Sequence, residues 1–311
     1  MEYKKNIYII GAGAVGKTLA VFLKNAGKQV VIIRGSVKDA SPITERIRIV
    51  CENDAVIEAD IEITTFSNFN SLNGMVVLAN KSFGNAQLAI DLHSKAGSSP
   101  IVLLQNGLGV ERPFMNTDFR GIYRAVLFFS SQFLDQNTLK FKPAARCPIG
   151  IEKGDTDTLN YIVEQLNTPA LEFRSESDIQ PLIWKKAIAN CAFNSICPLL
   201  EVDNGIFHRN EKALAIARRV IAECVAIARG QGIAISEKEV EETLLHISRS
   251  SDGQLISTLQ DIRNHRQTEI ETFNLEIATI AQSQGNEDAV LETKLLGELT
   301  QLKADANKRD S

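Results

Sequence analysis

The stretch Asn6–Lys17, NIYIIGAGAVGK, decides the fold of this chain. Asn6–Ile10 is an apolar run that predicts a buried strand, and Lys17–Asn25 has the pattern of a helix. Between them, six residues match GxGxxG: Gly11, Ala12, Gly13, Ala14, Val15 and Gly16. In this context the first glycine permits a tight turn, the second lets a pyrophosphate approach, and the third lets helix and strand pack closely. The stretch therefore predicts a dinucleotide-binding unit rather than a plain glycine-rich turn.

The next segments repeat this alternation of strand and helix. Apolar runs favour further buried strands, and a helical pattern separates the last two of them. The runs are Gln29–Ile33, Met75–Ala79 and Ile101–Leu104, and the helical pattern covers Asn85–Lys95. Continuous apolar runs are typical of a parallel sheet that is covered on both faces. Strand signals in Tyr123–Ile151, among them Val126–Phe129, predict an antiparallel extension of that sheet.

The character of the sequence changes after Ser177, where long helical patterns replace the strand signals. The chain has 311 residues, which is enough for about two domains. We therefore predict an α/β Rossmann-like N-terminal domain plus an all-α C-terminal domain. The first would be an NADP(H)-binding domain over residues 1–175, and the second a helical substrate and catalytic domain over residues 176–311.

Composition excludes several classes of protein. The formal net charge of -4 does not indicate nucleic-acid binding. The N-terminal apolar run is too short for a signal peptide, and no segment has the ~20 apolar residues of a membrane span. The five cysteines form no CxxC pair, so neither a zinc site nor a disulfide framework is indicated. We expect a cytoplasmic protein without a metal.

Arg34 follows the second predicted strand, where an NAD-binding site usually carries Asp or Glu for the ribose hydroxyls. An arginine there would instead pair with a 2′-phosphate, and Lys38 could assist it. We therefore expect NADPH as the cofactor, with a solvated surface arginine as the alternative.

Lys81 and Asn106 each follow a predicted buried strand. In open α/β sheets ligands bind beyond the carboxyl ends of the strands, so both residues become candidates for the site. The alternative is ordinary loop polarity.

The segment WKKAIANCAFNS, Trp184–Ser195, predicts a buried helix because it is apolar almost all round. With Lys186 at zero on a helical wheel, Asn190 lies at about 40° and Asn194 at about 80°. The three form one polar stripe, and Lys185 lies about 100° away from Lys186. Buried polar groups need partners, so the stripe predicts a surface for a ligand. Partial burial would also lower the pKa of the lysine, which suits proton transfer. Bonds to backbone or water are the alternative.

A second polar cluster lies in Leu255–Glu271, LISTLQDIRNHRQTEIE. Ser257 and Asp261 share a helical face, and Thr268 with Glu271 predicts a capping box that opens a helix toward Gln284. Glu269 would stand in the first turn of that helix. The alternatives are a surface hydroxyl for Ser257, an arginine partner for Asp261, and interaction with the helix dipole for Glu269.

Taken together, these motifs resemble the ketopantoate reductase family over nearly the full length. The resemblance rests on GAGAVG, Lys81, LQNGLG, WKKxxxNxxxN and STLQDIRNHRQTEIE, and the last two motifs are specific. It implies a Rossmann domain and a helical domain, and NADPH-dependent reduction of ketopantoate to pantoate on the route to coenzyme A.

The resemblance also implies roles for single residues. Lys186 matches the catalytic lysine, and Glu269 matches a substrate-binding glutamate that we also expect to take part in catalysis. Asn190, Asn194 and Ser257 match residues that hold the substrate. Asn106 and Lys81 match residues at the boundary of cofactor and substrate, and Arg34 matches one that binds the 2′-phosphate.

Other functions stay open at this level. The substrate could be another branched 2-oxo acid or an opine-type imine, and the chain could be an NADP(H)-binding sensor without activity. The expected partner is a small 2-oxo acid, with no nucleic acid and no membrane, and the assembly is either a monomer or a homodimer.

Overall fold

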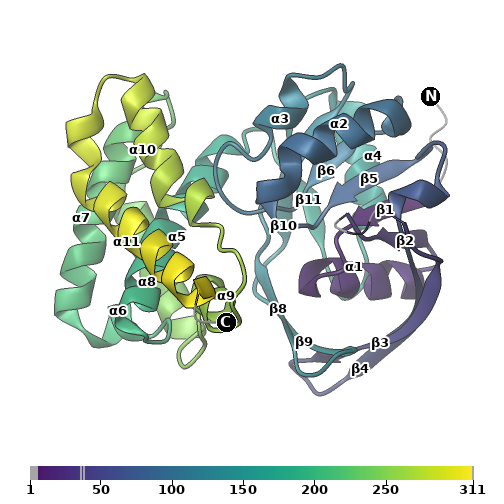
Figure 1. Cartoon of the computed structure of the whole chain (residues 1–311), viewed down its shortest axis with the longest axis horizontal. Helices are drawn as coiled ribbons and strands as arrows, with labels where there is room; N and C mark the ends of the chain where they lie inside the picture. The colour runs from purple at the N-terminus through teal and green to yellow at the C-terminus, as the bar shows by residue number, and fades with distance from the viewer. Residues whose placement is uncertain (1–5, 36, 38, 310–311) are drawn as a thin grey trace. The chain divides into compact units, whose positions relative to one another are not determined.

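The computed structural model describes residues 6–35, 37 and 39–309, and its contacts divide the chain into two units. The α/β unit comprises Met1–Gln105 and Val110–Ile179, and the helical unit comprises Asn106–Gly109 and Gln180–Ser311 (Figure 1). The sequence-based domains, 1–175 and 176–311, did not anticipate that the short segment 106–109 packs with the helical unit.

One sheet forms the frame of the α/β unit. Eleven strands of the described residues join it in the order β11-β10-β7-β6-β5-β1-β2-β4-β3-β9-β8. The five strands β1, β2, β5, β6 and β7 are parallel, which confirms the predicted parallel core. The strands are β1 Asn6–Ile10, β2 Gln29–Ile33, β3 Ile43–Cys51, β4 Val56–Thr64, β5 Met75–Leu78, β6 Ile101–Leu103, β7 Ile122–Ala125, β8 Phe129–Phe133, β9 Thr138–Pro143, β10 Cys147–Lys153 and β11 Phe173–Ser175.

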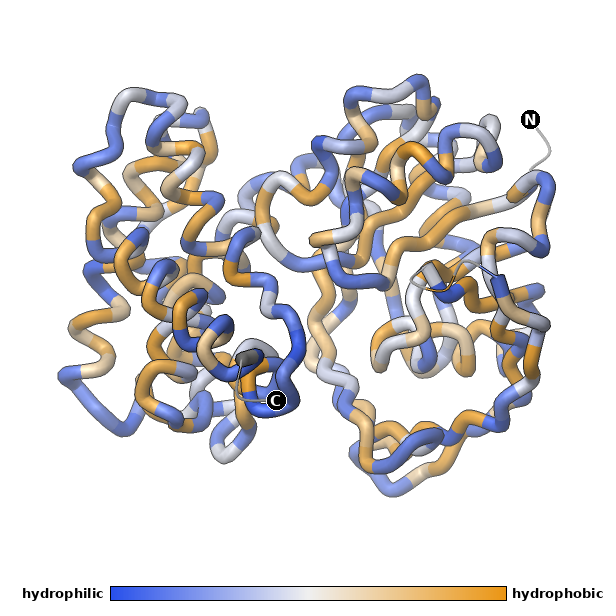
Figure 2. The backbone as a smooth tube through the Cα atoms, in the orientation of Figure 1, coloured by the Kyte–Doolittle hydropathy of each residue, from blue (hydrophilic) through white to orange (hydrophobic). Residues whose placement is uncertain are grey.

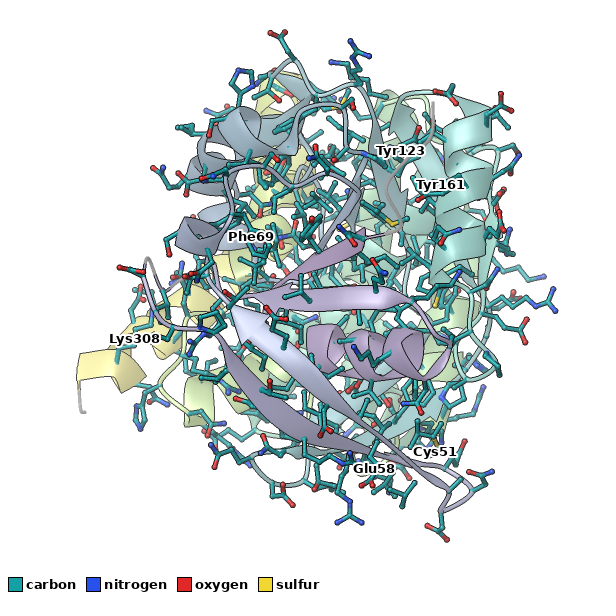
Figure 3. The ribbon with its side chains drawn as sticks, turned by 90° about the vertical axis from the view of Figure 1, so that its right-hand side faces the viewer. Cys51, Glu58, Phe69, Tyr123, Tyr161 and Lys308 are labelled. Carbon is teal, nitrogen blue, oxygen red and sulfur yellow. The ribbon has the colours of Figure 1, made fainter. Side chains whose placement is uncertain are left out.

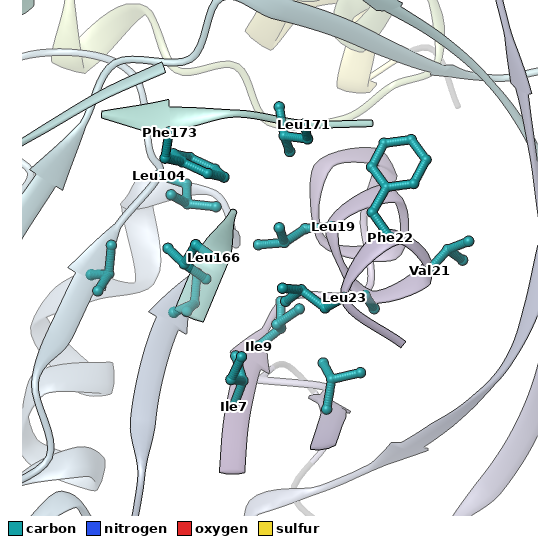
Figure 4. Packing of buried hydrophobic residues seen from close by; sticks show 14 of the residues in the cluster. Ile7, Ile9, Leu19, Val21, Phe22, Leu23, Leu104, Leu166, Leu171 and Phe173 are labelled. Atoms are coloured by element: carbon teal, nitrogen blue, oxygen red, sulfur yellow. The ribbon is translucent and has the colours of Figure 1, made fainter. Parts of the chain in front are cut away.

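Helices cover both faces of the parallel strands because side chains alternate along each strand. Ile7 and Ile9 of β1 pack with α1 and α4, whereas Tyr8 and Ile10 pack with α2 and α3. Figure 4 shows the first of these clusters, in which Leu19 and Leu23 of α1 point toward the strand that carries Ile7 and Ile9. The helices of this unit are α1 Ala14–Asn25, η1 Phe66–Asn68, η2 Ser82–Gly84, α2 Asn85–Ala96, α3 Arg112–Met115 and α4 Thr156–Leu166.

The outer strands differ most from the sequence-based expectation. The long antiparallel pair β3 and β4 was not predicted, although its residues alternate between buried and exposed. Arg46 on β3 donates hydrogen bonds to Glu58 and Asp60 on β4. Figure 3 labels Glu58 on this pair of strands.

The predicted antiparallel extension over Tyr123–Ile151 is confirmed, because β10 pairs with β7 and β8 pairs with β9 in antiparallel fashion. Within the strand signal Val126–Phe129, however, only Phe129 lies in a strand. An apolar run can be a buried connection as well as a strand.

The helical unit is built around α5, which contacts α7, α8, α9 and α11. Neighbours on so many sides explain why α5 is apolar almost all round, and they confirm that it is a buried helix. The elements are α5 Gln180–Leu200, α6 Ile206–Arg209, α7 Glu211–Gly230, α8 Glu237–Ser250, α9 Ser257–Arg263, η3 Ile270–Thr272, α10 Asn274–Ser283, η4 Glu287–Val290 and α11 Leu291–Arg309.

The predicted capping box at Thr268 and Glu271 is wrong. The short 3-10 helix η3 begins at Ile270, and the α-helix begins only at Asn274. The hydroxyl of Thr268 is buried and has no hydrogen-bond partner among the described residues. The capping-box pattern assumes one uninterrupted helix after the cap. Here the chain forms the short helix η3 first, and α10 begins separately at Asn274.

Candidate active site

The glycine loop between β1 and α1 is shaped by two glycines that no other residue could replace without strain. Gly11 has φ +116°, and a Cβ there would lie 2.6 Å from the backbone nitrogen of Asn80. A Cβ on Gly16 would lie 2.0 Å from the carbonyl oxygen of Gly11. Both glycines are therefore needed for the close packing of strand, loop and helix.

Gly13 is different, because it is exposed and a Cβ there would meet no atom within 4 Å. It is the N-cap of α1, which has no side-chain cap and no acidic residue in its first turn. The start of α1 thus presents N–H groups and the positive end of the helix dipole to an open space. Ala12, Ala14 and Val15 are half-buried against the core and hold this turn in place. The arrangement fits the pyrophosphate of a dinucleotide.

Arg34 lies beside this loop. The N–H of Gly11 donates to the carbonyl of Ile33 (2.9 Å), and the N–H of Arg34 donates to Thr64 at the end of β4 (2.9 Å). The Nε of Arg34 is buried and has no hydrogen-bond partner among the described residues. An unpartnered guanidinium nitrogen beside an open glycine turn fits a further phosphate group. Lys38, the predicted assistant, lies outside the described residues.

A network of amides follows the carboxyl ends of β5 and β6. The Nε2 of Gln105 donates to the carbonyl of Asn80 (3.0 Å) and to Oδ1 of Asn85 (2.8 Å). The Nδ2 of Asn80 donates to the carbonyl of Lys81 (2.8 Å), so the network also holds Lys81, which is half-buried. The Oδ1 of Asn80 is buried without a partner in the described part of the chain. Sequence reasoning missed Asn80, although it directly follows a buried strand.

The polar stripe of α5 is present in the helical unit. Lys186 and Asn190 are half-buried, while Asn194 is 2% exposed. The Nδ2 of Asn194 donates to the carbonyl of Asn190 (3.1 Å), and its Oδ1 accepts from Thr258 (2.8 Å) and Ser257 (3.5 Å) on α9. These bonds to Asn194 join α5 to α9 and place Ser257 beside the stripe.

Lys185 and Asp261 have structural partners. The Nζ of Lys185 lies 3.4 Å from a carboxylate oxygen of Glu239 on α8, away from the stripe. Asp261 is buried and forms an ion pair with Nε of Arg266 at 3.0 Å. An arginine partner was the alternative that the sequence offered for Asp261, and the structure confirms it.

Thr272 connects Glu269 to the segment of Asn106. Its hydroxyl and N–H donate to the carbonyl of Glu269 (2.9 and 3.0 Å), and its own carbonyl accepts from the N–H of Leu108 (2.8 Å). Gly107 has φ +97°, and a Cβ there would lie 2.5 Å from Cβ of Thr272. Asn106 is exposed and Glu269 is half-buried. Sequence reasoning missed Thr272, and its spacing carries no signal for this contact.

The predicted site residues thus fall into two groups. The glycine loop, Arg34 and Lys81 belong to the α/β unit, and Asn106, Lys186, Asn190, Asn194, Ser257 and Glu269 belong to the helical unit. Within the helical unit α5 contacts both α9 and η3, the elements that carry or adjoin Ser257 and Glu269. α5 thus carries an ammonium and two amides, is joined to the hydroxyl of Ser257 through Asn194, and contacts the short helix η3 that follows Glu269.

Two family models match the chain in sequence. Residues 7–151 match "Ketopantoate reductase PanE/ApbA", and residues 178–299 match "Ketopantoate reductase PanE/ApbA C terminal". The chain belongs to the ketopantoate reductase family. It is therefore a member of a family of nicotinamide-dependent oxidoreductases.

Individual members of the ketopantoate reductase family are distant from this chain. A 2-dehydropantoate 2-reductase of Pyrococcus abyssi is 27% identical over 279 residues, which are 89% of this chain and 91% of the relative. The structure of a 2-dehydropantoate 2-reductase from Geobacter metallireducens has a TM-score of 0.84 at 20% identity and covers 96% of this chain and 99% of its own. That of a D-mandelate dehydrogenase with NADH and anilino(oxo)acetate has a TM-score of 0.83 at 21% identity, covering 97% and 99%. These structures establish the shared fold.

The described residues contain no group of three or more His, Cys, Asp or Glu side chains placed to hold a metal ion. No helix among them is long and apolar enough to cross a membrane. All five cysteines are free thiols.

Proposed function

We propose that this protein reduces 2-dehydropantoate (ketopantoate) to (R)-pantoate with NADPH, in pantothenate biosynthesis. The proposal rests above all on the stripe of Lys186, Asn190 and Asn194 on α5, with Ser257 held against it through Asn194. Family membership supports the same reaction, since both family models carry this activity in their names.

The residues of the α/β unit are suited to hold the cofactor. Gly11, Gly13 and Gly16 leave the start of α1 open for the pyrophosphate, and the unpartnered Nε of Arg34 is available to a 2′-phosphate. An arginine in place of an acidic residue favours NADPH over NADH. NADPH, when bound, supplies the hydride that reduces the ketone carbon.

Lys186 is proposed to stabilise the oxygen of the ketone. When the ketone carbon becomes tetrahedral, negative charge accumulates on that oxygen, and an ammonium group beside it lowers the energy of this state. Lys186 then gives a proton to the oxygen, so that the product is an alcohol. Lys185 is not suited to this task because it is paired with Glu239.

The remaining polar residues of the helical unit are proposed to position the substrate. Asn190, Asn194 and Ser257 would bind the carboxylate and hydroxyl of the 2-oxo acid, with Asn194 also fixing Ser257. An ionised Glu269 would repel the carboxylate of the substrate, so its part is to accept a hydrogen bond from the hydroxyl or to orient Lys186. Asn106 and Lys81 would bind at the boundary of cofactor and substrate.

A second candidate substrate is another branched 2-oxo acid. A D-mandelate dehydrogenase shares the fold at nearly the same TM-score as a 2-dehydropantoate 2-reductase, so the fold alone does not choose the substrate. The proposal is tested by following NADPH oxidation with ketopantoate and with a panel of other 2-oxo acids, and by repeating the assay with NADH. Ketopantoate and NADPH should give the highest kcat/KM. A protein that binds NADPH but oxidises it with none of these acids would contradict the proposal.

A further inference from the structure

Two buried amides lie near the carboxyl ends of the parallel strands β5 and β6. Asn85 is the first residue of α2 and is 3% exposed, and Gln105 lies just after β6 and is 5% exposed. Both strands are hydrophobic throughout, as Figure 2 shows, so these amides adjoin an apolar core. Burying an amide costs free energy unless its hydrogen bonds are satisfied, so the partners of these two side chains matter.

The two side chains bond each other reciprocally. Nδ2 of Asn85 donates to Oε1 of Gln105, and Nε2 of Gln105 donates to Oδ1 of Asn85, both at 2.8 Å. Each amide also donates its second hydrogen, Asn85 to the carbonyl of Val110 (2.8 Å) and Gln105 to that of Asn80 (3.0 Å). All four donor hydrogens therefore have acceptors. A fully satisfied buried network of this kind holds one arrangement of the chain rigidly.

The amide pair, defined here as Asn85 and Gln105, holds both ends of the segment Asn106–Gly109. Gln105 and Val110 are the residues on either side of this segment, and the side chain of Asn85 bonds both of them. Asn106 therefore belongs to a loop whose two ends are attached to the same buried side chain.

The amide pair is also connected with Lys81. Oδ1 of Asn85 accepts from Nδ2 of Asn80 (3.5 Å), and that nitrogen donates to the carbonyl of Lys81 (2.8 Å). The carbonyl of Asn80 accepts from Gln105. One network thus joins the backbone at Lys81 to the base of the loop that carries Asn106.

We propose that Asn85 and Gln105 are positioning residues, whose amide pair holds Lys81 and the segment Asn106–Gly109 in one geometry for ligand binding. The inference rests on the proposed function, because it takes Lys81 and Asn106 as residues that bind cofactor and substrate. The amide pair itself is not available to a ligand, since both side chains are buried and their donor hydrogens already have acceptors. Apolar side chains of similar size would fill the same space, but their contacts are not directional and would not set the orientation of the backbone.

Asn85→Leu and Gln105→Met test this singly, since each replaces an amide by an apolar group of similar size. Hydrogen–deuterium exchange of the chain without NADPH should become faster in peptides that cover residues 79–85 and 105–110, because their hydrogen bonds are lost. The dissociation constant of NADPH, measured by fluorescence, and KM for ketopantoate should each rise about 10-fold. The change in kcat should be smaller, because Lys186 is unaltered. Unchanged exchange rates overturn the proposal.

The double variant, Asn85→Leu with Gln105→Met, separates positioning from stability. A single substitution leaves the other amide buried without its partner, whereas the double variant removes both amides. It should therefore withstand heat better than either single variant. Its dissociation constant for NADPH should nevertheless stay about 10-fold above that of the wild type. A double variant that regains wild-type affinity would show that the pair only fills space, which overturns the proposal even if the single variants do not fold.

A matched control lies at the amino ends of the same two strands. Ser99 precedes β6 and is 4% exposed, and its hydroxyl donates to the carbonyl of Leu72 and accepts from the N–H of Gly74, just before β5. Ser99→Ala should lower the melting temperature and leave the affinity for NADPH unchanged. An equal loss of affinity in this variant would mean that general destabilisation causes the effect, and the proposal would be wrong.

A last comparison shows whether the amide pair acts through Lys81 and Asn106. In a chain that already carries Lys81→Ala and Asn106→Ala, adding Asn85→Leu should change the dissociation constant of NADPH by less than about 2-fold, because the positioned side chains are gone. An undiminished effect in that chain overturns the proposal. A wild type that binds no NADPH contradicts the proposed function instead, and the exchange rates then still show whether the amide pair holds the two segments.

Discussion

At the scale of single residues, the two adjacent lysines of α5 should behave in opposite ways. Lys186→Ala should lower kcat for ketopantoate by about 100-fold or more, because the proton donor and the stabilising charge are both lost. Lys185→Ala is the matched control: it removes the same group one position earlier, and only the ion pair with Glu239 is affected. Steady-state NADPH oxidation measures both. A folded Lys186→Ala variant with near wild-type turnover would show that another group protonates the substrate.

Arg34 should decide which cofactor is preferred. Arg34→Gln should raise KM for NADPH about 10-fold and leave KM for NADH nearly unchanged, since a charged hydrogen bond to the 2′-phosphate contributes about 1.5–3 kcal/mol. Arg48→Gln, which changes an arginine on β3 that lies near Glu58, serves as control and should alter neither constant. Equal effects of Arg34→Gln on both cofactors would mean that the side chain does not contact that phosphate.

At the scale of elements, two glycines of the loop should have different roles, Gly16 in packing and Gly13 in ligand binding. Gly16→Ala should destabilise the fold, because its methyl group would meet the carbonyl oxygen of Gly11. Gly13→Ala should fold normally, since nothing lies near the added methyl group, yet it should bind NADPH more weakly by filling the space of the pyrophosphate. Thermal unfolding and NADPH titration by fluorescence measure the two effects. Unchanged NADPH affinity in Gly13→Ala would place the pyrophosphate elsewhere.

The contact of α5 with α9 depends on one buried amide. Thr258→Val removes the donor to Oδ1 of Asn194 and should lower the free energy of unfolding by about 1–3 kcal/mol, because a buried acceptor loses its main partner. It should also raise KM for the 2-oxo acid, because Ser257 lies next to Thr258 on α9 and would move with that helix. Thr279→Val is the control, because that hydroxyl is exposed on α10, and it should cost less than about 0.5 kcal/mol. If urea unfolding shows the same loss of unfolding free energy in both variants, Thr258 does not have this role.

Much of the frame could be predicted from the sequence, and the failures have physical causes. Buried parallel strands such as β1 can be recognised from their unbroken apolar runs. The helix α5 can be recognised from an apolar surface with one polar stripe. The pair β3 and β4 was missed because charged residues, six of its 18, interrupt the apolar positions that would otherwise mark its strands. Contacts such as that of Gly107 with Thr272 join residues far apart in sequence, and no local pattern encodes them.

At the scale of the whole molecule, carboxylates with lowered pKa values are present in both units. Some accept hydrogen bonds from the backbone: the N–H of Thr158 lowers the pKa of Asp155 at the start of α4. Others face a cation: Arg209 lowers the pKa of Asp203, with Nη2 2.7 Å from the carboxylate. Among the described residues, the carboxylates with a lowered pKa are Asp135, Asp155, Glu201, Asp203 and Glu239.

These groups make the fold sensitive to acid. Their pKa values are lower in the folded chain than the ordinary values of about 4, so their contribution to stability is complete above that pH and is lost as the pH falls below it. The urea midpoint should therefore be constant near neutrality and fall steadily below about pH 4.

Asp203→Asn should be less stable than the wild type at pH 7, because the ion pair with Arg209 is lost. Its stability should then fall less steeply in acid, since one titrating group is gone. Asp288→Asn, at an exposed position of η4, should follow the wild-type curve. If Asp203→Asn instead loses stability as steeply as the wild type below pH 4, the acid response arises from other groups.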